Sequence, residues 1–248
     1  MLTHALTLWG RTLRQRAVWS MLIWTVVFVL LLMVVLMVLG AGALASAFDH
    51  PSFSTPFTVA PHPGHLLGGI AAMYLVLLAA GPFVSAGVYG LYGQAVAGVR
   101  VTWRSFWTFG AQFYGRAWGL IAFLLIWTAA LSLVSTVLVG FLHVIGVLLV
   151  GLGFVLSWPL VMRMMGGLFV DRLSWSASFR AMFQKRHYGG LLGGAVLMLV
   201  AYAVLILLAV GLMHAVAVLG FLLYFAMMLF LAVAGPVWVF ALYRANGK

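Results

Sequence analysis

The hydrophobic positions of this chain fall into long runs that short polar segments interrupt. The runs Ala17–Ala47 and Leu66–Gly98 contain no charged residue, and each fits one membrane-spanning helix, which needs about 20 residues. The run Ala117–Met162 has 46 residues and Gly189–Tyr243 has 55, so each is expected to cross twice. The pattern predicts an all-α integral membrane protein with six transmembrane helices in one membrane domain, residues 1–248.

A single proline recurs in three of these apolar stretches. Pro82, Pro159 and Pro236 follow one another at an interval of 77 residues, in "GPFVSAGVYGLY", "WPLVMRMMGGLF" and "GPVWVFALYRAN", each within an even-numbered span. Mid-helix proline frees a backbone carbonyl and bends the helix, which a bilayer tolerates where neighbouring groups satisfy that carbonyl. We therefore expect three equivalent bends that open a central cavity between the even-numbered spans.

The odd-numbered spans repeat too. "WGRTLRQRAVW" from Trp9 matches "FGAQFYGRAWG" from Phe109, and a looser third copy, "FRAMFQKRHYGG" from Phe179, aligns Tyr188 with Tyr114. The chain is thus expected to consist of three tandem helical hairpins, with repeat units 1–98, 99–171 and 172–248. Parallel repeats of this kind are related by a pseudo-threefold axis along the membrane normal.

Aromatic residues at helical spacing precede each hairpin, with polar residues on the opposite helix face. This pattern predicts an amphipathic helix in the membrane interface before each hairpin. Tryptophans and arginines of these segments are expected to anchor the chain there. The expected anchors are Trp9, Trp103, Trp107, Trp175, Arg104, Arg116 and Arg180.

All thirteen Lys and Arg residues fall in segments on one side of the expected spans. The positive-inside rule then predicts a multi-pass protein of the cell membrane with both termini in the cytoplasm. The formal net charge of +11 is explained by this topology and by attraction to anionic lipid headgroups. Because no base-reading motif accompanies the charge, we expect no nucleic-acid partner.

Composition changes this picture little but excludes several chemistries. The chain is 66% hydrophobic with a mean hydropathy of +1.22, too apolar for a water-soluble globule. It contains no cysteine, which excludes disulfides and thiol catalysis. Its two acidic residues, Asp49 and Asp171, fall outside the expected spans, so a pair of catalytic carboxylates within the membrane is excluded.

Two segments carry a resemblance to known families. The stretches "DRLSWSASFRAMFQKRHYGGLLGG" and "GPFVSAGVYGLYGQAVAGVRVTWRSFW" resemble poorly characterised bacterial six-span membrane families, including the membrane domain attached to some glycerophosphodiester phosphodiesterases. The resemblance implies a six-span architecture in a bacterial inner membrane. It transfers no catalytic residue, because phosphodiesterase chemistry needs acidic metal ligands and this chain has two acidic residues in all.

Histidines gather at the side opposite the basic residues. His65, His143 and His214 each lie near the turn of one expected hairpin, and His62 or Asp49 of the first outer loop is available as a further metal ligand. If a threefold arrangement brought the three imidazoles together, they would suit Zn or Cu and leave a coordination position open. The alternative is that histidine is simply tolerated on a wet outer face.

Three functions remain open from the sequence. The first is transport or handling of an uncharged or amphiphilic substrate, since the spans hold too few polar groups to carry a bare ion. The second is an accessory or structural subunit that packs against a membrane-protein partner or a second copy of itself. The third is a metal-dependent membrane enzyme that uses the outer histidines, although a non-enzymatic role is favoured.

Overall fold

The apolar runs form long helices, and short amphipathic helices lie between some of them. The computed structural model describes residues 1–48, 63–183 and 188–247, and no strand occurs in these ranges. Their helices are α1 (Leu2–Leu13), α2 (Arg16–Phe48), α3 (Pro63–Val96), α4 (Ser105–Phe169), α5 (Trp175–Met182), α6 (Tyr188–Ala215) and α7 (Ala217–Asn246).

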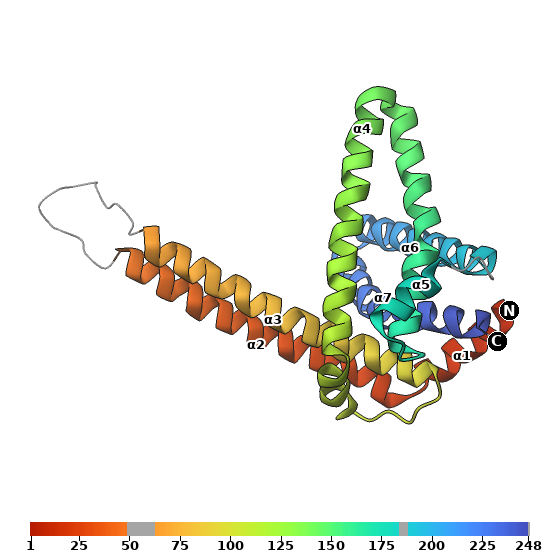
Figure 1. Cartoon of the computed structure of the whole chain (residues 1–248), viewed down its shortest axis with the longest axis horizontal. Coiled ribbons are helices and arrows are strands. Elements are labelled where there is room, and N and C mark those ends of the chain that lie inside the picture. Colours follow the sequence, from red (N-terminus) through yellow and green to blue (C-terminus); the bar gives the residue numbers. More distant parts are fainter. Residues whose placement is uncertain (49–62, 184–187, 248) are drawn as a thin grey trace, which may run out of the picture.

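Five helices, α2, α3, α4, α6 and α7, are long and apolar enough to cross a membrane. Of these, α4 has 65 residues but leaves helical geometry at His143 (φ 48°, ψ −119°), and there the chain turns back on itself (Figure 1). The turn is tight, since a Cβ on Gly146 would lie 2.2 Å from the Leu138 carbonyl oxygen. The prediction of an all-helical protein with several helices able to span a membrane is confirmed.

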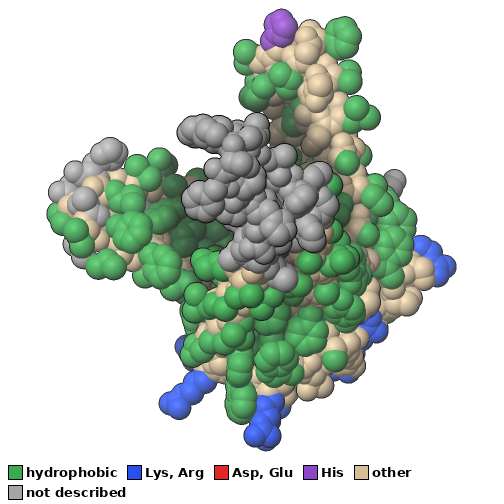
Figure 2. Space-filling view, turned by 90° about the vertical axis from the view of Figure 1, so that its left-hand side faces the viewer, with side chains coloured by type: hydrophobic (Ala, Val, Ile, Leu, Met, Phe, Trp, Pro, Cys, Tyr) green, Lys and Arg blue, Asp and Glu red, His purple; other side chains and the backbone are tan. Residues whose placement is uncertain are grey.

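Three hairpins leave a common base and point in different directions (Figure 1). They consist of α2 with α3, the two arms of α4, and α6 with α7. The base consists of α1, α5 and the ends of the long helices nearest to them, and both chain termini lie there. Figure 2 shows Lys and Arg side chains along the base, whereas none is visible on the projecting hairpins.

The amphipathic segments do not all form separate helices. The first and third are α1 and α5, but the second continues without a break into the long helix α4. A turn at Arg14 and Gln15 separates α1 from α2, whereas Ser105–Phe169 contains no break before His143. The prediction of a separate interfacial helix before the second hairpin is therefore wrong.

Each proline marks a change from exposed to buried helix. The stretches 70–80, 147–156 and 221–230 contain no buried residue, whereas burial begins at or near Pro82, Pro159 and Pro236 and continues to the helix end. The projecting parts of the hairpins therefore offer their apolar side chains to the surroundings. The parts that follow the prolines form the packed core of the base.

Aromatic rings fill the point where the helices that carry the prolines meet. Tyr89 of α3, Phe169 of α4 and Phe240 of α7 lie with ring centroids 5.7, 6.4 and 6.3 Å apart. Phe169 and Phe240 are fully buried. The expected central cavity is not found at this meeting point.

Candidate functional site

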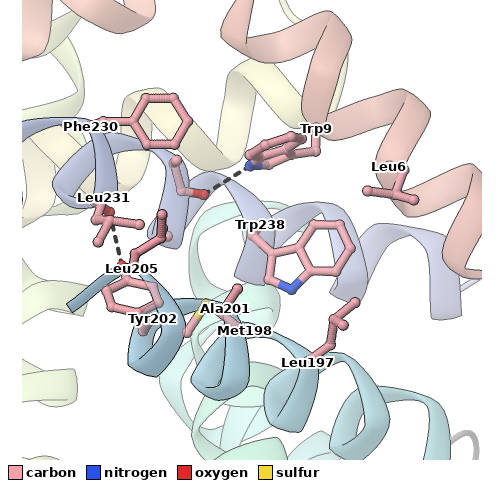
Figure 3. A pocket seen from close by; sticks show the side chains of 12 residues that line it. Leu6, Trp9, Leu197, Met198, Ala201, Tyr202, Leu205, Phe230, Leu231 and Trp238 are labelled. Carbon is pink, nitrogen blue, oxygen red and sulfur yellow. Dashed lines mark hydrogen bonds between the residues drawn. The ribbon is translucent and has the colours of Figure 1, made fainter. Parts of the chain in front are cut away.

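An apolar pocket lies to one side of the base, between α1, α6 and α7 (Figure 3). Its volume is about 230 Å³. Leu6 and Trp9 of α1 form one wall, α6 forms the second and the α7 segment before and after Pro236 forms the third. The lining comprises Leu6, Trp9, Leu197, Met198, Ala201, Tyr202, Leu205, Phe230, Leu231, Ala234, Gly235 and Trp238.

The polar atoms of the lining side chains are all used in hydrogen bonds to backbone carbonyls. Trp9 Nε1 donates to the Ala234 carbonyl at 2.9 Å, and the Tyr202 hydroxyl donates to the Leu231 carbonyl at 3.0 Å (Figure 3). Trp238 Nε1 donates to the Gly194 carbonyl at 3.1 Å. The pocket therefore presents hydrocarbon and aromatic surface to whatever occupies it.

Small residues and ring contacts fix the pocket walls. Trp9 and Trp238 meet edge to face, with centroids 6.1 Å apart and planes at 83°, the geometry that aromatic pairs prefer. A Cβ on Gly235 would lie 2.5 Å from the Tyr202 hydroxyl oxygen, so a larger residue there would displace the tip of this side chain.

The pocket opens sideways onto the surface that faces lipid if the hairpins cross a bilayer. Leu6, Leu197 and Phe230 line it and keep 48%, 49% and 38% of their surface exposed. Tryptophan and tyrosine next to such an opening are typical of the boundary between headgroups and acyl chains. The opening is suited to lateral entry of an apolar chain.

Shortly before each proline, a backbone carbonyl accepts a hydrogen bond from an aromatic side chain. The Tyr114 hydroxyl donates to the Ala79 carbonyl, three residues before Pro82, at 3.2 Å. Tyr188, which the sequence aligns with Tyr114, donates to the Leu156 carbonyl, three residues before Pro159. The Trp9 bond to Ala234, two residues before Pro236, takes the corresponding place in the third hairpin.

The expected anchors Trp103 and Trp107 flank Trp24 of α2. The ring of Trp103 stacks on Trp24 at 5.8 Å, and the ring of Trp107 meets it edge-on at 5.7 Å. The Arg104 guanidinium lies 5.1 Å from the Trp103 ring centre. Both tryptophans stay nearly half exposed, at 49% and 45%, as side chains of an interfacial belt do.

The remaining anchors lie around α4 and α5. Trp175 begins α5, stacks on Phe179 at 5.5 Å and takes the space that a Cβ on Gly119 would need. The Arg116 guanidinium lies 5.0 Å from the Phe113 ring centre. Arg180 Nε bonds the Ser176 carbonyl within α5 at 3.5 Å. The interfacial role of these residues stays a prediction.

The histidine positions lie at the far ends of different hairpins. His143 is exposed at the break in α4, His65 lies at the start of α3, and His214 lies near the end of α6. Because the hairpins point in different directions, the structure does not bring these positions together (Figure 1). Asp49 and His62 lie outside the described residues. Within the ranges that the structure describes, no group of three His, Asp or Glu side chains is placed to hold Zn or Cu.

Polar contacts that the sequence did not predict join the helix ends in the base. Gln94, the single amide in its apolar run, is 1% exposed and bonds both Phe169, the last residue of α4, and Arg172 in the segment that follows α4. Asp171, which lies outside the expected spans, accepts bonds from Tyr243 at 2.6 Å and Arg244 at 3.3 Å. The sequence did carry one signal for the Gln94 contacts, because a lone amide in an apolar span needs a hydrogen-bond partner.

Comparison with known proteins gives no relative from which a role could be transferred: no family model, curated protein or solved structure matches this chain.

Proposed function

We propose that this protein is a multi-pass membrane protein that holds the hydrocarbon part of an amphiphile in the pocket between α1, α6 and α7. In this proposal the three hairpins supply six crossings, the base lies at the cytoplasmic face, and both termini are cytoplasmic. The break of α4 at His143 and the Lys and Arg side chains along the base in Figure 2 support this arrangement. The similar hydrogen bonds near the three prolines support a threefold repeat of the hairpins.

The observation that carries the proposed ligand is the lining of the pocket. Trp9, Tyr202 and Trp238 donate their hydrogen bonds to backbone carbonyls, so no side-chain donor of the lining is left for a ligand. A polar ligand would lose its hydration in such a pocket without replacement, at a cost of about 1–3 kcal/mol per group. An acyl chain has no polar group to satisfy and gains from every buried methylene, by about 0.8 kcal/mol.

Photo-crosslinking tests this proposal. The purified protein is reconstituted with a phospholipid that carries a diazirine in one acyl chain, exchanged into lipid-free detergent to remove loosely held lipid, and then irradiated. We expect the retained label on peptides that contain Ala201 or Leu231, which line the pocket from α6 and α7. Label spread evenly over the exposed helices, such as α2 and the arms of α4, would contradict a specific pocket.

A second candidate function is that of an accessory subunit, and the filled centre of the base favours it. Tyr89, Phe169 and Phe240 leave no room for a substrate path where the proline-bearing helices meet. The hairpins also expose large apolar side chains, of which Phe141 is 83% exposed. Mass measurement of the protein extracted in mild detergent distinguishes the two, because a subunit would come out in stoichiometric complex with its partner.

A further inference from the structure

A second hollow, of about 710 Å³, lies in the base on the opposite side of α1 from the apolar pocket. Leu6 and Trp9 of α1 face the apolar pocket. His4 and Arg11 of the same helix, and Gln15 just after it, line the second hollow. Helix α1 thus separates an apolar site from a basic one. We call the second hollow the basic cleft.

Four arginines line the basic cleft, and they come from four different parts of the chain. Arg11 belongs to α1, Arg16 begins α2, Arg100 lies in the loop between α3 and α4, and Arg244 lies in the last turns of α7. Four cationic side chains around one hollow repel one another and create a positive potential inside it. The walls between them are formed by small and apolar residues such as Ala17, Ala95 and Val101.

The described part of the chain offers these arginines a single carboxylate. Asp171 bonds Arg244 at 3.3 Å and also accepts from Tyr243. Arg11, Arg16 and Arg100 form no ion pair with any residue in the described ranges, and the other acidic residue of the sequence, Asp49, lies outside them. Three cationic side chains at one hollow are therefore without an anionic partner from these ranges.

We propose that the basic cleft binds the phosphate group of an anionic ligand. Guanidinium groups match phosphate oxygens with paired, charge-assisted hydrogen bonds, and several arginines around one hollow can hold one group from more than one side. The volume of about 710 Å³ accommodates a headgroup larger than a bare phosphate ion. The two sources of such a group are the headgroup of an acidic phospholipid and a soluble phosphate ester. The inference is independent of the proposed acyl-chain pocket, because the two sites share no residue.

Thermal unfolding in detergent, with and without ligand, tests the inference. The ligands are phosphatidylglycerol, phosphatidylcholine as the zwitterionic reference, and soluble glycerol phosphate, all at 150 mM salt to weaken unspecific attraction. For the wild-type chain we expect phosphatidylglycerol or glycerol phosphate to raise the melting temperature by several degrees and phosphatidylcholine to leave it unchanged. A response to the lipid alone assigns the site to a headgroup, and an equal response to glycerol phosphate assigns it to a soluble ester.

The double variant Arg11→Gln with Arg100→Gln removes two arginines of the cleft. Its matched control, Arg14→Gln with Arg104→Gln, removes the same charge from the same two segments at exposed positions that do not line the cleft. We expect at least a tenfold loss of apparent affinity in the first variant and less than a twofold loss in the control. Equal losses in both variants, or no response of the wild-type chain to any anionic ligand, would overturn the inference.

Gln15→Glu keeps the test decisive if the double variant folds poorly. This change places a carboxylate in the cleft wall with nearly the same side-chain shape. We expect the ligand-free protein to melt at a higher temperature than the wild type, because the carboxylate relieves the repulsion, and to respond less to the anionic ligand. An unchanged response to the ligand would count against the cleft.

Discussion

The side-chain carbonyl of Gln94 accepts two hydrogen bonds from the guanidinium of Arg172, 3.0 Å from Nε and 2.7 Å from Nη2. The amide nitrogen of Gln94 donates to the Phe169 carbonyl at 2.6 Å. One buried side chain near the end of α3 thus holds both the last residue of α4 and Arg172, three residues further along the chain. Arg172 has a left-handed backbone, with φ 56°, so this contact helps to fix a turn that a non-glycine residue adopts reluctantly.

Replacing Gln94 by alanine should destabilise the protein by about 1–3 kcal/mol, because it leaves a buried carbonyl and a guanidinium without their partner. Gln112→Ala serves as the control, since Gln112 is exposed on α4. Its effect should stay within about 0.5 kcal/mol. Thermal unfolding in one detergent measures both, and equal stability of the two variants would show that the Gln94 contacts contribute nothing.

Gly93→Ala should also destabilise the base. A Cβ at this position would lie 2.7 Å from the Phe169 carbonyl oxygen, which belongs to the backbone of a packed helix and has little room to move. Overpacking of this kind costs about 1–3 kcal/mol. Gly115→Ala is the matched control, because no neighbouring atom lies within 4 Å of its added Cβ. The control should be neutral or more stable, given the higher helix propensity of alanine.

The hydrogen bond of Tyr114 should depend on Pro82. Tyr114→Phe removes the donor to the Ala79 carbonyl, at a cost of about 0.5–1.5 kcal/mol. In a Pro82→Ala background we expect a smaller cost, because without the bend at proline the carbonyls of the preceding turn point along the helix axis and away from Tyr114. A double-mutant cycle on unfolding free energies measures the coupling. Tyr188→Phe, which acts near Pro159, should show no coupling to Pro82.

The orientation of the hairpins can be measured because the chain contains no cysteine. We expect His143→Cys, at the exposed break of α4, to react with a membrane-impermeant thiol reagent added outside intact cells. Arg104→Cys, in the exposed turn before α4, should react only after the membrane is opened. The reverse result would place the base outside and would refute the topology drawn from the basic residues.

The sequence predicted the long helices well because their signal is local. An apolar run of sufficient length forms a helix in a bilayer whatever its neighbours are, since the backbone must bond within itself. The turn near His143 followed from the same argument, because a run of 46 residues is too long for one crossing. Tyr114 and Tyr188, which the sequence aligns, each bond a carbonyl three residues before a proline, a contact that the alignment by itself did not predict.

The contacts between helices were not predictable in this way. The apolar pocket joins α1 with α6 and α7, the first and last helices of the chain, and no local pattern encodes their contact. The rings of Tyr89, Phe169 and Phe240 fill the meeting point because they reach one another across the base. Hydrophobic periodicity along one helix does not predict such distances between helices. The basic cleft likewise brings together Arg11 and Arg244, which lie near opposite ends of the chain. Taken one segment at a time, these arginines indicate only the membrane topology.

The most direct test of the proposed function fills the apolar pocket. Ala201→Trp puts an indole into the pocket from α6, and Ala203→Trp puts the same group on an exposed position of the same helix outside the lining. The phospholipid that remains bound after detergent exchange is counted by native mass spectrometry for variants that elute like the wild type. We predict that Ala201→Trp loses the retained lipid and that Ala203→Trp keeps it, whereas equal retention in both variants would contradict a lipid-holding pocket between α1, α6 and α7.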